Sequence, residues 1–181
     1  MARWAGGSFA RMRAWWWRCA LVVFFLGPLA PAAPAQAPQD GALLHDIRQA
    51  IGNVFTEEEV CDRFVERFER AGVQRDPLLL GYQGAVRMAR GRHAFDPLSR
   101  LVHFNGGKAM LEKAIASDRS NTELRFLRLT IQVNVPAFLG YDGNKAEDLA
   151  LVEGRLHEVK DPVVRDRIVR FIAASRASGK L

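Results

Sequence analysis

The segment from residue 121 to residue 141 most constrains how this chain can fold, because Thr122 to Val133 contains no glycine or proline and is rich in large apolar residues. At about 100° per residue, these residues cover most of the circumference of a helix. They are Leu124, Phe126, Leu127, Leu129, Ile131 and Val133. Asn121 is a suitable N-cap, and Pro136 disfavours helical geometry in the residue before it. We therefore predict a central helix at about 122–134 that is buried on nearly all sides.

A narrow polar stripe interrupts this apolar surface. Asn121, Arg125, Arg128 and Gln132 follow the spacing i, i+4, i+7, i+11, which places them on one face of the helix. A buried arginine without a partner is costly, so both guanidinium groups require acceptors.

One interpretation is structural: the arginines bind carboxylates or helix-end carbonyls of neighbouring helices. Glu123 is the expected ion-pair partner, because it is the carboxylate nearest to the stripe in sequence. The alternative is a pocket for an anionic ligand or a peptide carboxylate, since a guanidinium group binds carboxylates with paired hydrogen bonds. That pocket has to be open, and its candidate residues are Glu123, Arg125, Arg128, Gln132, Asn134 and Tyr141.

The N-terminal region resembles an export signal. Arg3, Arg11, Arg13 and Arg18 precede an apolar run from Cys19 to Leu29, and a segment rich in alanine and proline follows. The run is short for a membrane span. We predict a signal peptide at 1–35, cleaved after Ala35, and a periplasmic or secreted protein. The alternative is an uncleaved N-terminal membrane anchor; after cleavage we expect no stable membrane insertion.

Removal of this segment changes the charge of the protein. The four arginines leave with it, so 26 − 4 = 22 basic residues remain against 20 acidic ones, a net charge of +2. The pI of about 9.9 therefore belongs partly to the signal peptide, and no nucleic-acid partner is expected. Cys61 is the only cysteine left, and its spacing from Val60, Phe64 and Phe68 predicts a small buried side chain.

The rest of the chain predicts an all-α fold of about seven helices, packed as antiparallel helical hairpins. No segment combines strand periodicity with hairpin turns. The expected organisation is a flexible N-terminus at 36–41, a single helical domain at 42–175 and a frayed tail at 176–181. Within this domain, Asp-Pro pairs begin helices at 77, 97 and 162, Thr56 to Glu59 form a capping box, and a sixth helix reaches Val159. Gly81 and Gly84 allow another helix to approach closely, and Gly106 with Gly107 marks a tight crossing or a kink.

Two resemblances bear on the fold. Lys113 to Asn121 resembles the end of a tetratricopeptide repeat, although Arg119 replaces the proline of that motif and no second copy occurs. The chain also resembles a family of small exported bacterial proteins of unknown function. The segments that carry this resemblance are 82–85, 105–108, 123–128 and 135–141. Together they imply a helical-repeat-like (TPR-like) fold and no particular activity.

Motifs for catalysis, metal binding or phosphate binding do not occur in the sequence, so we assign no catalytic residue, metal site or cofactor. The leading hypothesis is a non-enzymatic module of the cell envelope that binds a protein or peptide in a groove between helical hairpins. The alternative is a small-ligand binder or small enzyme that uses the residues of the central helix. A third possibility is a structural subunit with a permanent partner, which an exposed apolar patch would favour.

Overall fold

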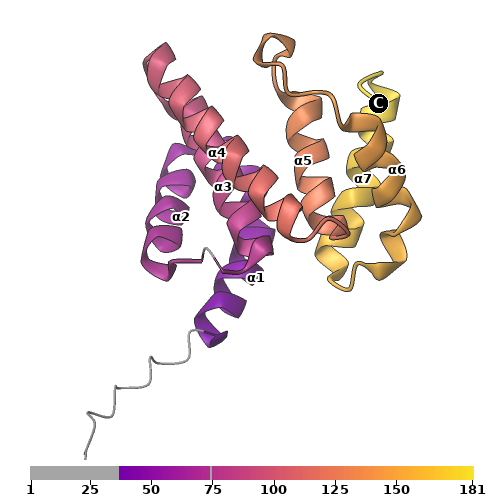
Figure 1. The fold of residues 1–181 in the computed structure, drawn as a ribbon, viewed down its shortest axis with the longest axis horizontal. Coiled ribbons are helices and arrows are strands. Elements are labelled where there is room, and N and C mark those ends of the chain that lie inside the picture. The colour runs from indigo at the N-terminus through magenta and orange to yellow at the C-terminus, as the bar shows by residue number, and fades with distance from the viewer. Residues whose placement is uncertain (1–36, 74) are drawn as a thin grey trace, which may run out of the picture. The chain divides into compact units, whose positions relative to one another are not determined.

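The structure of the chain, a computed structural model, describes residues 37–73 and 75–181. The predicted signal peptide and its cleavage site after Ala35 lie outside these residues. The described part is all-α, as predicted, and contains no strand (Figure 1). Its seven α-helices are α1 (Ala37–Val54), α2 (Glu58–Ala71), α3 (Pro77–His93), α4 (Pro97–Ser117), α5 (Thr122–Asn134), α6 (Lys145–Gly154) and α7 (Pro162–Ala177). Two short 3₁₀ helices, η1 (Ala137–Leu139) and η2 (Leu156–Glu158), lie on either side of α6.

Most helix ends follow the expected capping chemistry. The side chains of Asp76, Asp96 and Asp161 each accept hydrogen bonds from backbone N–H groups in the first turn of α3, α4 and α7, with proline next in the chain. Asn121 accepts from the amides of Glu123 and Leu124, so α5 has the predicted start. Gly72, with φ 61°, ends α2 in the left-handed conformation that glycine adopts most readily.

Three local predictions were wrong. Helix α1 begins at Ala37, so residues 37–41 are helical where we expected a loose N-terminus. The capping box does not form: Glu57 is the N-cap of α2, and the Thr56 hydroxyl instead donates to the carbonyl of Asn53 at the end of α1. Helix α6 ends at Gly154, before Val159, because glycine is a poor helix residue and the chain turns into η2 there.

Helices α3 and α4 cross closely, and the glycines predicted to mark a tight crossing or a kink lie at this crossing. A Cβ atom on Gly84 would lie 2.7 Å from the carbonyl oxygen of Gly107, and a Cβ on Gly107 would clash with Gly84 and Met88. Farther along, a Cβ on Gly91 would lie 2.8 Å from the carbonyl oxygen of Arg100. The absence of side chains at these positions lets the two backbones touch, so α3 and α4 pack as one close pair.

The apolar core has two parts, and α5 contributes to both. The larger cluster joins α1 to α4 and takes Leu124, Leu127 and Ile131 from α5. The smaller cluster joins α6 and α7 and takes Phe126 from α5. Every residue from Thr122 to Leu129 is buried, which confirms the predicted central helix. In Figure 1, α5 lies between the α3–α4 pair and the α6–α7 pair.

Candidate functional site

The residues predicted to form a pocket on the central helix are almost all buried. Arg128 is 4 % exposed, Gln132 2 % and Tyr141 4 %, and Glu123 and Arg125 are also below one tenth. Asn134 lies apart from them at the exposed end of α5. Its amide donates to the carbonyl of Thr130 and its carbonyl oxygen accepts from Lys180. The open pocket that an anionic ligand requires is therefore not present among these side chains.

The two arginines bind a carboxylate that the sequence analysis did not identify. Asp148 of α6 is fully buried and accepts two hydrogen bonds from Arg128, both of 2.7 Å, and one of 2.9 Å from Arg125. Arg125 also donates to Glu147 and to the carbonyl of Arg119. These contacts confirm the structural interpretation of the arginines: they join α5 to α6.

Arg128 extends the same cluster towards α4. It donates to Glu112, whose other oxygen accepts a hydrogen bond from the hydroxyl of Tyr141. Burial by itself would lower the pKa of Arg128, but the hydrogen bond and the charge of Asp148 outweigh burial, so its pKa is raised. Burial, and then the hydrogen bond to Glu112, raise the pKa of Tyr141. We call Arg125, Arg128, Asp148, Glu112 and Tyr141 the α5 ion network.

Glu123 has different partners from those predicted. Its carboxylate accepts hydrogen bonds of 2.7 and 2.6 Å from Arg48 of α1 and one of 2.7 Å from the hydroxyl of Tyr82 of α3. Arg48 also binds Asp161, the N-cap of α7. The expectation that Glu123 pairs with Arg125 and Arg128 was wrong, because it lies on a different face of α5 from them. Glu123 instead ties together three helices that are distant in sequence.

Two of the ion-pair partners that were not predicted, Asp148 and Arg48, do lie in recognisable sequence patterns. Asp148 stands four residues before the fully buried Val152, so it shares the inner face of α6. Arg48 continues the helical series Leu44, Ile47, Ile51 on α1. A charged residue on an apolar stripe indicates a buried ion pair, although the pattern does not say which helix supplies the partner.

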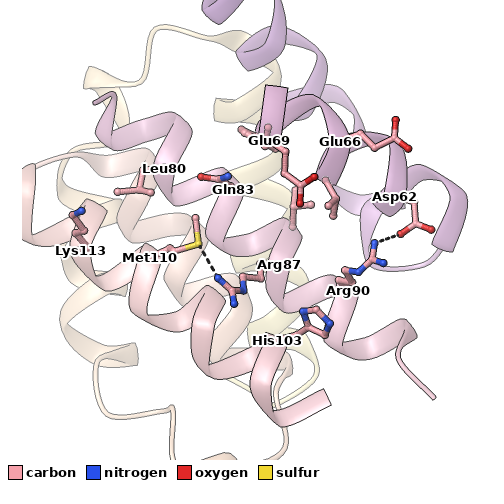
Figure 2. Close-up of a pocket in the computed structure, with 13 residues that line it drawn as sticks. Asp62, Glu66, Glu69, Leu80, Gln83, Arg87, Arg90, His103, Met110 and Lys113 are labelled. Atoms are coloured by element: carbon pink, nitrogen blue, oxygen red, sulfur yellow. Dashed lines mark hydrogen bonds and ion pairs between the residues drawn. The ribbon is translucent and has the colours of Figure 1, made fainter. Parts of the chain in front are cut away.

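A more open candidate site lies between α2 and the α3–α4 pair (Figure 2). This groove has a volume of about 780 Å³, within the range of ligand pockets. Its floor is apolar and its rim is charged. The residues that line it are Asp62, Val65, Glu66, Phe68, Glu69, Leu80, Gln83, Val86, Arg87, Arg90, His103, Met110 and Lys113.

The charges of the groove are separated by sign. Helix α2 contributes the carboxylates of Asp62, Glu66 and Glu69, whereas α3 and α4 contribute basic side chains, as Figure 2 shows. The ion pair between Asp62 and Arg90 connects α2 to α3. Among the described residues, Glu69, Arg87 and Lys113 have no ion-pair partner, so both sides of the groove present available charges.

Gln83 and Arg87 also line this groove. The Oε1 atom of Gln83 is buried and has no donor within the described part of the chain. Buried polar atoms are nearly always hydrogen-bonded in native proteins, so this amide oxygen is an exception among the described residues. The guanidinium of Arg87 lies against Gly106, where a Cβ would approach it to 2.6 Å, and its Nη1 contacts the sulfur of Met110.

The sequence analysis did not identify this groove. The acidic residues Asp62, Glu66 and Glu69 follow the spacing i, i+4, i+7 beside Val65 and Phe68, which is the one available sequence signal. Which helix lies opposite this acidic face depends on the tertiary structure.

Cys61 is fully buried, as predicted, and its thiol lies 3.7 Å from the carbonyl of Val86. Burial raises the pKa of the thiol to about 11, so the reactive thiolate is disfavoured at neutral pH.

His93 contacts the carbonyl of Val54. Within residues 37–73 and 75–181, no three histidine, cysteine, aspartate or glutamate side chains are grouped so as to hold a metal ion.

Comparison with protein-family models, with curated proteins and with solved structures found no match to this chain. Among the described residues, no helix has both the length and the apolar composition needed to cross a bilayer.

Proposed function

We propose that this protein is an exported, non-enzymatic module of the cell envelope that binds a peptide or protein segment in the groove between α2 and the α3–α4 pair. The proposal combines the N-terminal sequence pattern with the groove. The single observation that carries it is the arrangement of available charges of opposite sign above an apolar floor. Antiparallel pairing of neighbouring helices supports a TPR-like arrangement as part of this proposal.

The groove defines the chemistry of the segment that fits it. Apolar side chains pack on Val65 and Met110, a basic residue faces Glu69, and an acidic residue or a C-terminal carboxylate faces Lys113. An amphipathic segment with charges of both signs satisfies all of these contacts, whereas a small anion satisfies only one side.

Selection from a random peptide library, displayed on phage and panned against the purified protein, tests the proposal. We expect enriched peptides that combine apolar residues with both charges. Glu69→Lys and Lys113→Glu, measured by titration calorimetry with those peptides, should each weaken binding about tenfold or more, because each variant replaces an attraction by a repulsion.

Glu153→Lys is the matched control. Glu153 is an exposed carboxylate on α6, a helix that packs against α5, so its reversal changes the net charge as Glu69→Lys does, but outside the groove. If the selected peptides bind the groove variants and the control equally well, or if no peptide is enriched, the proposed groove is not the binding site.

A further inference from the structure

The start of α4 exposes large apolar side chains that the groove does not use. Phe95 is 98 % exposed, and Leu98, Leu101 and Val102 are also exposed, at 72 %, 45 % and 53 %. Leu98, Leu101 and Val102 follow the spacing i, i+3, i+4, so they share one face of the helix, and Phe95 lies in the turn before it. We call these four residues the apolar tip.

The apolar tip lies at one end of the α3–α4 pair. In Figure 1 the start of α4 is at the end of this pair that points away from α5, α6 and α7. These side chains are largely exposed, and none of them is among the residues that line the groove. A protein partner would need a concave surface of matching shape, whereas the interfacial layer of a bilayer accepts protruding apolar side chains without one.

The segment of the chain that carries the tip contains more basic than acidic residues. From residue 77 to residue 111 the chain contains five basic residues, Arg87, Arg90, Arg92, Arg100 and Lys108, and a single acidic one, Asp96. The formal net charge of this segment is therefore 5 − 1 = +4, but Arg90 is paired with Asp62, Arg87 lines the groove and Lys108 lies over the ring of Tyr141. The basic residues nearest to the tip in the chain are Arg92 and Arg100. The carboxylate of Asp96 is occupied as the N-cap of α4, where it accepts from the amide of Ser99.

Basic groups also lie close to the tip. The guanidinium of Arg100 donates to the carbonyl of Ala94, which holds it beside the turn that carries Phe95. Arg92, in the last turn of α3, is exposed. Apolar side chains with basic neighbours are typical of surfaces that bind anionic lipid, because insertion removes apolar area from water while the arginines attract the headgroups.

We propose that the apolar tip docks this protein on the surface of an anionic lipid bilayer, with Phe95 and Leu98 inserted into the interfacial layer and Arg92 and Arg100 facing the lipid headgroups. This docking is independent of the peptide groove, since the two sites share none of these four residues. It requires no helix to cross the membrane.

Vesicle binding by the full chain tests this proposal. The probes are vesicles of phosphatidylcholine alone and vesicles of equal parts phosphatidylcholine and phosphatidylglycerol. Because the N-terminal apolar segment can itself associate with lipid, hydrogen–deuterium exchange read by mass spectrometry locates the contact along the chain. We expect slower exchange in residues 94–102 with the anionic vesicles and no change there with the neutral ones.

Substitutions at the apolar tip can be compared with a substitution of an exposed apolar residue elsewhere. Phe95→Ser and Leu98→Ser should each weaken the lipid-dependent protection about tenfold, and Arg100→Gln about fivefold. Phe138→Ser is the control, because Phe138 is 86 % exposed but lies in η1, away from the tip. All four side chains are exposed, so circular dichroism should show unchanged folding.

Two results would overturn the proposal. The first is exchange in residues 94–102 that does not differ between anionic and neutral vesicles. The second is a concentration-dependent dimer, seen by analytical ultracentrifugation without lipid, that Phe95→Ser abolishes, since a second copy of the chain would then cover the tip. Peptide binding in the groove, measured on the same variants, should remain at the wild-type level in either case.

Discussion

The α5 ion network and the groove between α2 and α3 both contain carboxylates and arginines, yet the two regions differ in how those charges are satisfied. In the network, Asp148 is fully buried and its two oxygens accept three hydrogen bonds from two arginines. In the groove, Glu69 and Lys113 are exposed, and among the described residues they have no ion-pair partner.

This difference separates structure from candidate function. A buried charge whose hydrogen-bonding capacity is filled by neighbouring helices stabilises one packing arrangement and has nothing left for a ligand. An exposed charge beside an apolar floor contributes little to folding and remains available for binding. The number of arginines on a helix is therefore a weaker guide to function than whether their N–H groups already have acceptors within the protein.

Removal of the central carboxylate should break the network most severely. Asp148→Ala leaves two buried guanidinium groups without their main acceptor and should lower the free energy of unfolding by about 3–5 kcal/mol. For a domain of this size that corresponds to a fall in the thermal midpoint of roughly 6–20 °C, measured by circular dichroism. Asp46→Ala is the control: its pair with Arg67 is partly exposed and is worth about 0–1 kcal/mol. Equal effects of the two variants would contradict the network's structural role.

The groove depends instead on the close packing of the α3–α4 pair. Gly107→Ala places a methyl group against the backbone of Gly84 and the side chain of Met88, and should cost about 1–3 kcal/mol through overpacking. In contrast, a Cβ on Gly52 of α1 meets no atom within 4 Å, so Gly52→Ala should leave the thermal midpoint unchanged or raise it. A neutral Gly107→Ala would show that α3 and α4 separate readily, and would weaken the description of the groove as preformed.

Titration to alkaline pH tests whether Tyr82 and Tyr141 are buried. Burial, and then the negative charge of Glu123, raise the pKa of Tyr82 above its ordinary value of about 10, and Tyr141 is shifted in the same direction. A raised folded-state pKa contributes stability that is present below about pH 10 and is lost as the pH rises towards the folded-state value.

The chain has only these two tyrosines, so tyrosinate absorbance reports on them alone. We expect the absorbance to rise together with the loss of helical circular dichroism. Tyr82→Phe should lower the free energy of unfolding at neutral pH by about 1–3 kcal/mol. The free energy of unfolding of this variant should also fall less steeply as the pH rises above about 10. Tyrosine ionisation near pH 10 in a chain that stays fully helical would contradict the burial.

The smallest effects on stability are expected in the groove. Glu69→Gln and Lys113→Gln remove charges without ion-pair partners in the described residues and should change the free energy of unfolding by no more than about 0.5 kcal/mol. Urea denaturation followed by circular dichroism measures this change. A loss of more than about 2 kcal/mol in either variant would mean that the groove charges hold the fold, and the contrast with the α5 ion network would disappear.

Much of the fold could be predicted because its signals are local. The start and end of α5 follow from Asn121 and Pro136, and Asp-Pro pairs at three places begin helices as expected. The errors at Thr56 and Gly154 are also local: the chain uses Thr56 to finish α1, and a glycine ends α6 although the apolar spacing continues to Val159.

The candidate site could be predicted only in part. The sequence indicated that Arg125 and Arg128 are buried and need acceptors, and both statements are confirmed. It did not identify Asp148, because a carboxylate on the inner face of another helix has the same local pattern whichever helix it meets. The groove was missed for a related reason, since its acidic and basic sides come from different helices.

The sequence by itself determined most of the helices and the burial of residues 122–129, because capping and amphipathic spacing act between residues a few positions apart. Only the tertiary structure decided the partners. Arg48 and Glu123 are 75 residues apart in the chain, and Arg48 and Asp161 are 113 apart. The choice between alternative carboxylates depends on which helix faces lie within hydrogen-bond distance after packing. After packing, Glu69 and Lys113 of the groove have no ion-pair partner among the described residues, whereas the charged groups of the α5 ion network are paired with one another.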